Sequence, residues 1–393
     1  MKNITKSGLS AMLALAVSTA SVWAQDAQET FKIGGLLALS GPLGVLGEDA
    51  QKGMDLAIEE RGGMLLDVPI EITWQDTESK PQIAVQKATQ VMSNGAQFLV
   101  GSVGSSETLA IMKMSAARKV PLLVPLSSDP SITGENGNDY TFRTASSGDT
   151  LALVAAKYLE QLAPTSIYGV ASDYAVARAG WEFAKTELSD TAEAVGEDFP
   201  AYGETDFSVI VNKIANSGAQ AAYVGTGGSD SIAFIKQAGE IGLLDRVKLV
   251  GPNLVDTTVA AGAGDASIGV ATALRYDPSI DTEANKAFVE AYQAKYGELP
   301  SQLAGDAYDG LKWWMEVVDS TGSWDPNDWM GAFSGHTWDG SILGTRTMRP
   351  CDNQSQHPSF VAEAVAGPDD AMPYVMNILT EYAAADIATE CKE

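Results

Sequence analysis

The chain has 393 residues, of which 45% are hydrophobic, and 51 acidic residues outnumber 25 basic ones to give a net charge of −26 at pH 7. We expect nucleic acid and anionic lipid to repel such a chain, because phosphate binding depends on lysine and arginine. The length favours two lobes, since a single hydrophobic core rarely grows beyond about 250–300 residues.

Residues 1–24 have the features of a cleaved secretory signal peptide. Lys2 and Lys6 precede a short apolar run, and small residues lie beside the expected cleavage point at Ala24. The run is too short and too often interrupted by serine and threonine to anchor the protein in a membrane. Removing the two lysines leaves 23 basic and 51 acidic residues, a net charge of −28. No later segment has about 18 consecutive apolar residues, so we expect a soluble mature protein that begins near Gln25.

Strands alternate with amphipathic helices along the rest of the chain. Short apolar runs predict strands at residues 31–37, 70–74, 98–100, 122–124 and 166–170. Apolar stripes at helical spacing predict helices around residues 50–58, 83–91, 107–118 and 151–162. This alternation predicts an α/β fold with parallel sheets.

Two stretches of the chain recur in the same order. Residues 94–108 read NGAQFLVGSVGSSET, and residues 217–231 repeat the pattern as SGAQAAYVGTGGSDS. Downstream, KVPLLVPLSSDP at residues 119–130 is matched by RVKLVGPNLVDT at residues 246–257. The repetition predicts two similarly built lobes; chance similarity between β-α-β units is the alternative.

The repeated loops are the candidate binding site, because ligands bind beyond the carboxyl ends of the strands in an open parallel sheet. Loops 101–106 and 125–130 of one lobe and loops 225–230 and 251–257 of the other would then form a cleft that closes on a small solute. The first-lobe loops offer the hydroxyls of Ser105, Ser106, Ser127 and Ser128. Helix N-termini beside these hydroxyls favour an anion, and the absence of lysine and arginine there favours a carboxylate over a phosphate. The alternative is that the serines only cap helices.

The motifs of common enzyme classes are missing. The sequence has no G-x-S-x-G or H-E-x-x-H, and GTGGSDS lacks the lysine of a phosphate-binding loop. The first strand leads into ALSGPLGVLG, which is no dinucleotide-binding motif. His336 and His357 lie far from the repeated loops in sequence, and we expect them in loops or on the surface. We therefore expect neither catalysis nor a cofactor nor a metal site.

The only cysteines are Cys351 and Cys391. In an oxidising compartment we expect them to form a disulfide that tethers the C-terminal tail. Two unrelated buried thiols are the alternative.

Several motifs together resemble one family. They include residues 34–60, the GSVGSSET loop at 101–108, the strand and loop at 119–128, and AGDAYDGLKWW at 304–314. These are similar to the type I periplasmic solute-binding proteins of branched-chain amino acid ABC transporters, the leucine/isoleucine/valine-binding kind, over nearly the whole mature chain. In residues 304–314 we expect one of two adjacent tryptophans to be partly exposed and Tyr308 to reach the cleft.

The resemblance implies two Rossmann-like lobes joined by three crossovers. The first lobe would comprise residues 25–145 plus 278–350. The second would comprise residues 146–277 plus 351–393, with a strand in SFVAEAV. The implied function is capture of a hydrophobic amino acid or related organic acid by lobe closure in the periplasm. We expect a monomer that delivers its ligand to an inner-membrane permease with a cytoplasmic ATPase; a ligand-sensing receptor subunit is the alternative.

The family's residues transfer only partly to this sequence. The resemblance implies carboxylate donors at Ser105, Ser127 and Ser128. It places Asn253 where the family has the acidic partner of the ligand's α-ammonium group, and Thr226 and Gly227 where the family has an aromatic residue.

Asparagine cannot offset the desolvation of a buried ammonium group. Either Asp256 or Asp230 replaces the missing acid, or the ligand is an aliphatic or aromatic carboxylate without an amine. We expect the apolar walls of the cleft to come from Tyr174, Leu43, Leu46 and Val103.

Overall fold

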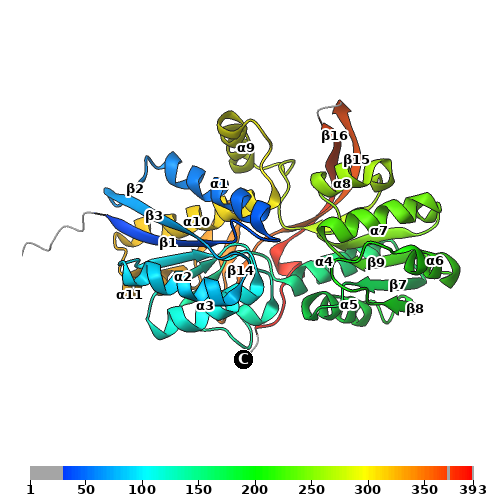
Figure 1. Cartoon of the computed structure of the whole chain (residues 1–393), viewed down its shortest axis with the longest axis horizontal. Coiled ribbons are helices and arrows are strands. Elements are labelled where there is room, and N and C mark those ends of the chain that lie inside the picture. The colour runs from blue at the N-terminus through cyan, green and yellow to red at the C-terminus, as the bar shows by residue number, and fades with distance from the viewer. Residues whose placement is uncertain (1–29, 370–371, 392–393) are drawn as a thin grey trace, which may run out of the picture.

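The computed structural model describes residues 30–369 and 372–391, so the predicted signal peptide lies outside the described residues. Figure 1 shows two lobes side by side, one containing the blue and cyan elements and the other the green elements. Each lobe is built on a sheet of mostly parallel strands, so the predicted α/β fold is confirmed.

The first sheet has the strand order β2-β3-β1-β4-β5-β6. Its strands are β1 (Phe31–Leu37), β2 (Met64–Leu65), β3 (Val68–Asp76), β4 (Phe98–Gly101), β5 (Leu122–Val124) and β6 (Thr141–Arg143). All neighbours from β3 to β6 pair in parallel, and only the short edge strand β2 is antiparallel. Short runs that are buried on both faces are typical of a parallel sheet covered by helices.

Helices cover both faces of this sheet, as the alternation of side chains along a strand requires. Ile33 and Leu37 pack on the side of α1 (Gly44–Glu60) and α10 (Gln302–Thr321), whereas Leu36 packs on the side of α2 (Pro81–Ser93) and α3 (Ser105–Ala117). Gly53 lets α1 and α10 approach closely, because a Cβ atom there would lie 2.1 Å from the carbonyl oxygen of Ala304.

Both tryptophans of α10 are fully buried, so the expectation that one is partly exposed was wrong. Trp314 stacks on Phe98 with ring centroids 3.9 Å apart, and Trp313 packs edge-on against Phe333. Both tryptophans pack against α11 (Pro326–Phe333), a helix that the sequence pattern did not reveal. Tyr308 is buried and donates to Glu60 of α1 at 2.7 Å, so it does not reach the junction between the lobes.

The second sheet has the strand order β16-β15-β11-β10-β9-β7-β8. Its strands are β7 (Ser166–Ala171), β8 (Glu193–Asp198), β9 (Ala221–Gly225), β10 (Lys248–Pro252), β11 (Ala271–Leu274), β15 (Ser359–Asp369) and β16 (Met372–Tyr382). Strands β15 and β16 form an antiparallel hairpin at one edge, drawn in orange and red in Figure 1. The predicted strand at SFVAEAV is therefore confirmed as β15.

One face of this sheet packs on α4 (Gly148–Gln161) and α5 (Ala175–Glu187), and the other on α6 (Ser208–Ser217), α7 (Gly228–Glu240) and α8 (Thr257–Ala263). The remaining elements are α9 (Glu283–Tyr296), β12 (Thr337–Trp338), β13 (Arg346–Met348), β14 (Ser355–Gln356), and the 3₁₀ turns η1 (Pro130–Ile132), η2 (Leu243–Asp245), η3 (Gly264–Ser267) and η4 (Ala384–Ile387).

The segment after Pro350 stays with the first lobe for several residues. Strand β14 pairs with β13, and Gln354 forms a bridge with Arg143 at the end of the first sheet. We propose that the first lobe extends through β14, a few residues beyond the predicted boundary at 350.

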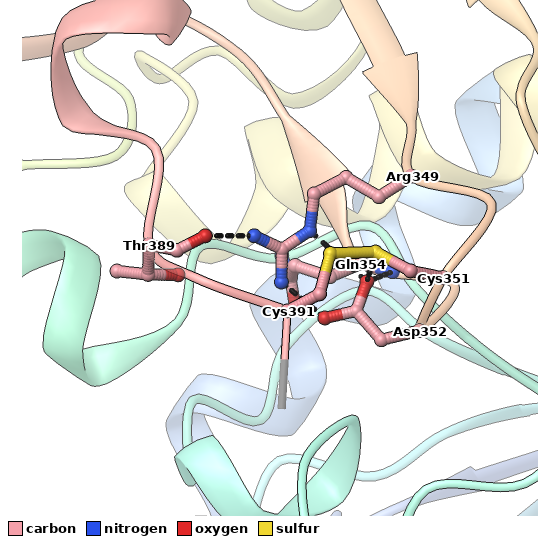
Figure 2. The surroundings of a disulfide bond; sticks show 6 residues. All are labelled: Arg349, Cys351, Asp352, Gln354, Thr389 and Cys391. Carbon is pink, nitrogen blue, oxygen red and sulfur yellow. Dashed lines mark hydrogen bonds and ion pairs between the residues drawn. A yellow bond between two sulfur atoms is a disulfide. The ribbon is translucent and has the colours of Figure 1, made fainter. Parts of the chain in front are cut away.

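The predicted disulfide joins Cys351 to Cys391, with Cα atoms 6.2 Å apart and a sequence separation of 40. Arg349 lies beside the bond and donates to the Asp352 carboxylate and to the carbonyl oxygen of Thr389, as Figure 2 shows. The tail is therefore held at the end of β13 both covalently and by the hydrogen bond from Arg349 to Thr389.

Candidate functional site

The carboxyl ends of the two sheets meet at one junction. Arg275 follows β11 of the second sheet, and its Nη1 donates at 2.8 Å to the carbonyl oxygen of Leu126, which lies just beyond β5 of the first sheet. Nε of the same buried side chain lies 3.1 Å from a carboxylate oxygen of Asp306 in α10. Because parallel strands end at the same edge of a sheet, the neighbouring loops after β4 and β10 also point toward this junction.

A second contact joins the loop of Ser128 to the first residue of α4, which lies beside Val176 of α5. The backbone N–H of Gly148 donates to the carbonyl oxygen of Ser128 at 2.8 Å. A Cβ atom at Gly148 would lie 3.2 Å from that oxygen and 3.2 Å from Cγ1 of Val176. Because Gly148 has no side chain, the Ser128 carbonyl and the Val176 side chain can both lie beside it. Tyr174, two residues before Val176, is therefore close to the loop of Ser128.

The strand order singles out two positions as the places where ligands bind in such sheets. In the first sheet β1 lies between β3 and β4, and in the second β7 lies between β8 and β9, so the direction in which successive strands are added reverses beside β1 and beside β7. Ligands bind at such switch points. The loop after β4 leads into Ser105 and Ser106 at the start of α3, and the loops after β7 and β9 carry Tyr174 and then Thr226 with Gly227. Ser127, Ser128, Asn253 and Asp256 follow the strands one place further along each sheet.

Ser127 uses its hydroxyl inside the first lobe. The residue is 1% exposed, its Oγ donates to the carbonyl oxygen of Ser102 at 2.7 Å, and it lies 2.7 Å from Oγ1 of Thr108. These bonds hold the loops after β4 and β5 together. They favour the structural alternative for this hydroxyl.

The other first-lobe serines are not needed as helix caps. Glu107 caps α3 by accepting from the backbone N–H of Gly104 at 3.0 Å, and it also accepts from Oγ of Ser102 at 2.8 Å. Ser105 is half-buried, and its Oγ accepts from the backbone N–H of Asp129 at 3.3 Å. Ser106 is exposed and Ser128 is half-buried. Within the part of the chain that the structure describes, the hydroxyl hydrogens of these three serines are donated to no protein acceptor.

The two candidate acidic residues of the second lobe, Asp256 and Asp230, accept hydrogen bonds from the protein itself. Asp256 accepts from the backbone N–H of Val259 at 2.7 Å and so caps α8. Asp230 is 2% exposed and accepts from the backbone N–H of Gly203 at 2.9 Å. Asn253 is exposed in the left-handed region with φ of +49°.

Thr226 is buried and its Oγ1 lies 2.9 Å from Oγ of Ser231, so this hydroxyl also has an internal partner. Gly227 is exposed, and a Cβ atom there would meet no heavy atom within 4 Å. The second lobe therefore offers open space where the family's aromatic residue was expected.

The loop after β1 supplies apolar side chains. Asp76 holds this loop, because its Oδ1 accepts from the backbone N–H of Leu39 at 2.9 Å and its Oδ2 accepts from Oγ of Ser40 at 2.6 Å. Leu46 is 40% exposed, whereas Leu43 is half-buried. Val103, predicted as a wall residue, is half-buried and packs against the core.

Tyr174 and Tyr202 form an exposed aromatic pair at the same edge of the second sheet. Their ring centroids lie 5.9 Å apart at an interplanar angle of 87°, and the residues are 47% and 69% exposed. Partial burial raises the pKa of the Tyr174 hydroxyl, and the neighbouring Tyr202 and Asp230 raise it further. Tyr202 was missed in the sequence because it follows the edge strand β8, outside both repeated stretches.

Both histidines lie in loops, as expected, but neither is fully exposed. His357 is 5% exposed, with Nδ1 2.8 Å from the carbonyl oxygen of Pro358 and Nε2 3.1 Å from Oγ of Ser146, so it is a buried structural residue. His336 is half-buried and accepts from Nε1 of Trp313 at 2.9 Å. Among the described residues, the one cluster of potential metal ligands is Cys351, Asp352 and Cys391, and its two sulfurs form the disulfide. Within the same residues no helix has the length and apolarity to cross a bilayer.

A family model described as periplasmic binding protein matches residues 30–369. The chain belongs to this family. Among curated relatives of this periplasmic binding protein, the leucine-, isoleucine-, valine-, threonine- and alanine-binding protein of Pseudomonas aeruginosa is 26% identical over 80% of this chain and 84% of its own length. Leu/Ile/Val-binding protein homolog 6 of Brucella melitensis is 25% identical over 94% of this chain and 96% of its own length. The resemblance seen in the sequence is confirmed.

Solved structures agree with this assignment. An amino acid ABC transporter substrate-binding protein from Pseudomonas fluorescens superposes with a TM-score of 0.84 at 25% identity, over 90% of this chain and 96% of that one. A solute-binding protein of an ABC transporter from Rhodopseudomonas palustris, solved with 3,4-dihydroxybenzoic acid, has a TM-score of 0.81 at 23% identity, over 91% of this chain and 98% of that one. The second likeness shows a shared fold.

Proposed function

We propose that this periplasmic binding protein is the substrate-binding component of an ABC importer, and that it captures a small carboxylate between its two lobes. It would release this solute to an inner-membrane permease driven by a cytoplasmic ATPase. The observation that carries the proposal is the hydrogen bond from Arg275 to the carbonyl oxygen of Leu126, because it joins the strand ends of the two lobes at one junction. The names of the relatives support the transport role.

The carboxylate would bind the first lobe. Ser105, Ser106 and Ser128 keep donor capacity at the start of α3 and beside the junction, and loops 101–106 and 125–130 contain no basic residue. Hydroxyl donors and a helix N-terminus suit a singly charged acid better than a phosphate group.

The ligand would carry no α-ammonium group. Asn253 takes the place of the family's acidic partner, Asp256 caps α8, and Asp230 is buried against Gly203. An ammonium group enclosed between the lobes without a free carboxylate would lose its hydration with no compensating partner. Keto acids and aromatic acids avoid this cost.

Matched ligands test the proposal by thermal shift and titration calorimetry, because a ligand of the native state raises its melting temperature. The probes are leucine, its keto-acid analogue 4-methyl-2-oxopentanoate, benzoate, and a dicarboxylate. We expect the keto acid or benzoate to bind at least tenfold more tightly than leucine, a difference of about 1.4 kcal/mol. Tighter binding of leucine contradicts an amine-free ligand, and no response to any acid contradicts capture of a carboxylate.

Restoring the acid gives the converse test. Asn253→Asp should strengthen leucine binding about tenfold by supplying a charged partner. Asn216→Asp, an exposed position on α6, adds the same charge away from the junction and should leave leucine binding unchanged. Equal effects of the two substitutions would argue against a ligand beside Asn253.

Lobe closure is tested by small-angle X-ray scattering with and without the tightest probe. A ligand that bridges both lobes must favour the closed state through its differential contacts. We expect the radius of gyration to fall on saturation, and an unchanged value counts against closure.

A further inference from the structure

The second lobe lacks an aromatic side chain at the loop after β9. Thr226 and Gly227 occupy the position where the family resemblance placed one. Gly227 and Gly228 are both exposed, and a Cβ atom on either would meet nothing within 4 Å. The loop therefore borders open space with no apolar surface of its own.

Two hydrogen bonds donated by backbone N–H groups hold the neighbouring loop, which carries Tyr202, beside this space. The N–H of Asp173 donates to the carbonyl oxygen of Pro200 at 2.7 Å, which ties the loop after β8 to the loop after β7. The N–H of Gly203 donates to Oδ2 of Asp230 at 2.9 Å, which ties the same loop to the first turn of α7. Tyr202 thus lies between the loop of Tyr174 and the helix that begins right after Gly227.

The rings of Tyr202 and Tyr174 remain accessible after they pack together. They meet edge to face, with centroids 5.9 Å apart, and 69% of Tyr202 and 47% of Tyr174 stay exposed. Each ring therefore keeps surface for a third ring, and aromatic groups favour such tilted or offset arrangements over random contact. The pair lies at the carboxyl-end edge of the sheet. Tyr174 precedes α5, whose Val176 lies beside Gly148, and the N–H of Gly148 donates to the carbonyl oxygen of Ser128.

We propose that Tyr202 supplies the aromatic surface missing at Thr226 and Gly227, and that with Tyr174 it forms a wall selecting aromatic carboxylates over aliphatic ones. This inference rests on the proposed function, because it names the substrate class of the same site. The acid group would bind the serines of the first lobe, and the ring would contact the tyrosines of the second. A ligand held in this way bridges the two lobes.

The test compares benzoate with cyclohexanecarboxylate, which has the same acid group and a ring of similar size without aromatic electrons. Titration calorimetry of the full mature protein measures both affinities in the wild type and in Tyr202→Ala and Tyr202→Phe. We expect Tyr202→Ala to weaken benzoate at least tenfold and cyclohexanecarboxylate less than threefold. Tyr202→Phe should keep both within threefold, since the ring remains. Because Tyr202 is 69% exposed, the alanine variant should keep the wild-type melting temperature.

Val209→Ala is the matched control, since Val209 of α6 is 66% exposed and follows no strand end. It should leave both affinities unchanged. Equal weakening of both ligands by Tyr202→Ala overturns the aromatic preference. Unchanged benzoate binding overturns the role of Tyr202, and if Ser128→Ala still weakens benzoate, the proposed function stands. Failure of the wild type to bind either ring acid overturns the inference, while binding of 4-methyl-2-oxopentanoate in that case keeps carboxylate capture intact.

Discussion

The guanidinium group of Arg275 donates to the carbonyl oxygen of Leu126 and pairs with the carboxylate of Asp306, so one side chain joins the strand ends of both lobes. Burial raises the pKa of Asp306 to about 6, and the positive charge of Arg275 opposes this rise. The pair therefore depends on Arg275 to keep Asp306 ionised at neutral pH.

Arg275→Met should lower the free energy of unfolding by about 3–5 kcal/mol at pH 7, because it leaves a buried carboxylate without its partner. Urea denaturation measures the change. Arg275→Met combined with Asp306→Asn should recover a large part of the loss. Lys286→Met breaks an exposed pair with Asp281 and Glu283 and should cost at most about 1 kcal/mol. An equally small loss at Arg275 would mean that this junction is not held by the pair.

The adjacent serines Ser127 and Ser128 should separate stability from binding. Ser127→Ala removes a buried donor to Ser102 and should cost about 1–3 kcal/mol of unfolding free energy. Ser128→Ala should change stability by less than about 0.5 kcal/mol but weaken the carboxylate ligand about tenfold. Urea denaturation and calorimetry on the same two variants check this, and the reverse assignment would place the binding donor at Ser127.

The disulfide should matter for stability. Replacing both Cys351 and Cys391 by serine opens a loop with a sequence separation of 40 and should lower the unfolding free energy by about 3–4 kcal/mol through the greater entropy of the unfolded chain. Denaturation of the reduced wild-type protein should give the same loss. A loss below about 1 kcal/mol would show that Arg349 and its contacts hold the tail without the bond.

The stability of the protein should depend on pH through His357. Burial, aided by the nearby charge of Arg346, lowers the pKa of His357 to about 3, so the native imidazole is neutral, with Nδ1–H donating to Pro358. Because the unfolded residue binds a proton near pH 6.5 and the native one does not, stability is lost as pH falls from 6.5 toward 3.

Between pH 6.5 and 3 the free energy of unfolding of the wild type should therefore fall by up to about 1.4 kcal/mol per pH unit more than that of His357→Gln. Denaturant melts at pH 7, 6, 5 and 4 measure the free energy of unfolding of both proteins. Subtracting one value from the other at each pH cancels the contributions of the other titrating groups. Asp306 is one of these, since its raised pKa makes native protonation favour stability at low pH, in the opposite direction. Parallel pH profiles would place His357 in contact with solvent.

Local sequence determined the elements of this protein and the order of its loops. The strand at residues 31–37 and the strand at 122–124 match β1 and β5, and the recurrence of Gly-Ala-Gln before β4 and β9 marks matching positions in the two lobes. Periodicity carries this information because each strand or helix buries a face set by its own repeat. Parallel sheets then fix which loops share an edge.

Only the tertiary structure decided what individual side chains do. The burial of Trp313 depends on Phe333 of α11, the next helix along the chain, and the internal bond of Ser127 depends on Ser102 of another loop. The loop of Tyr202 is tied to the start of α7 by the bond from Gly203 to Asp230, a contact between segments 27 positions apart. The sequence does not distinguish a hydroxyl or an aromatic ring that packs in the core from one that contacts a ligand, because its partners come from segments that only folding brings together.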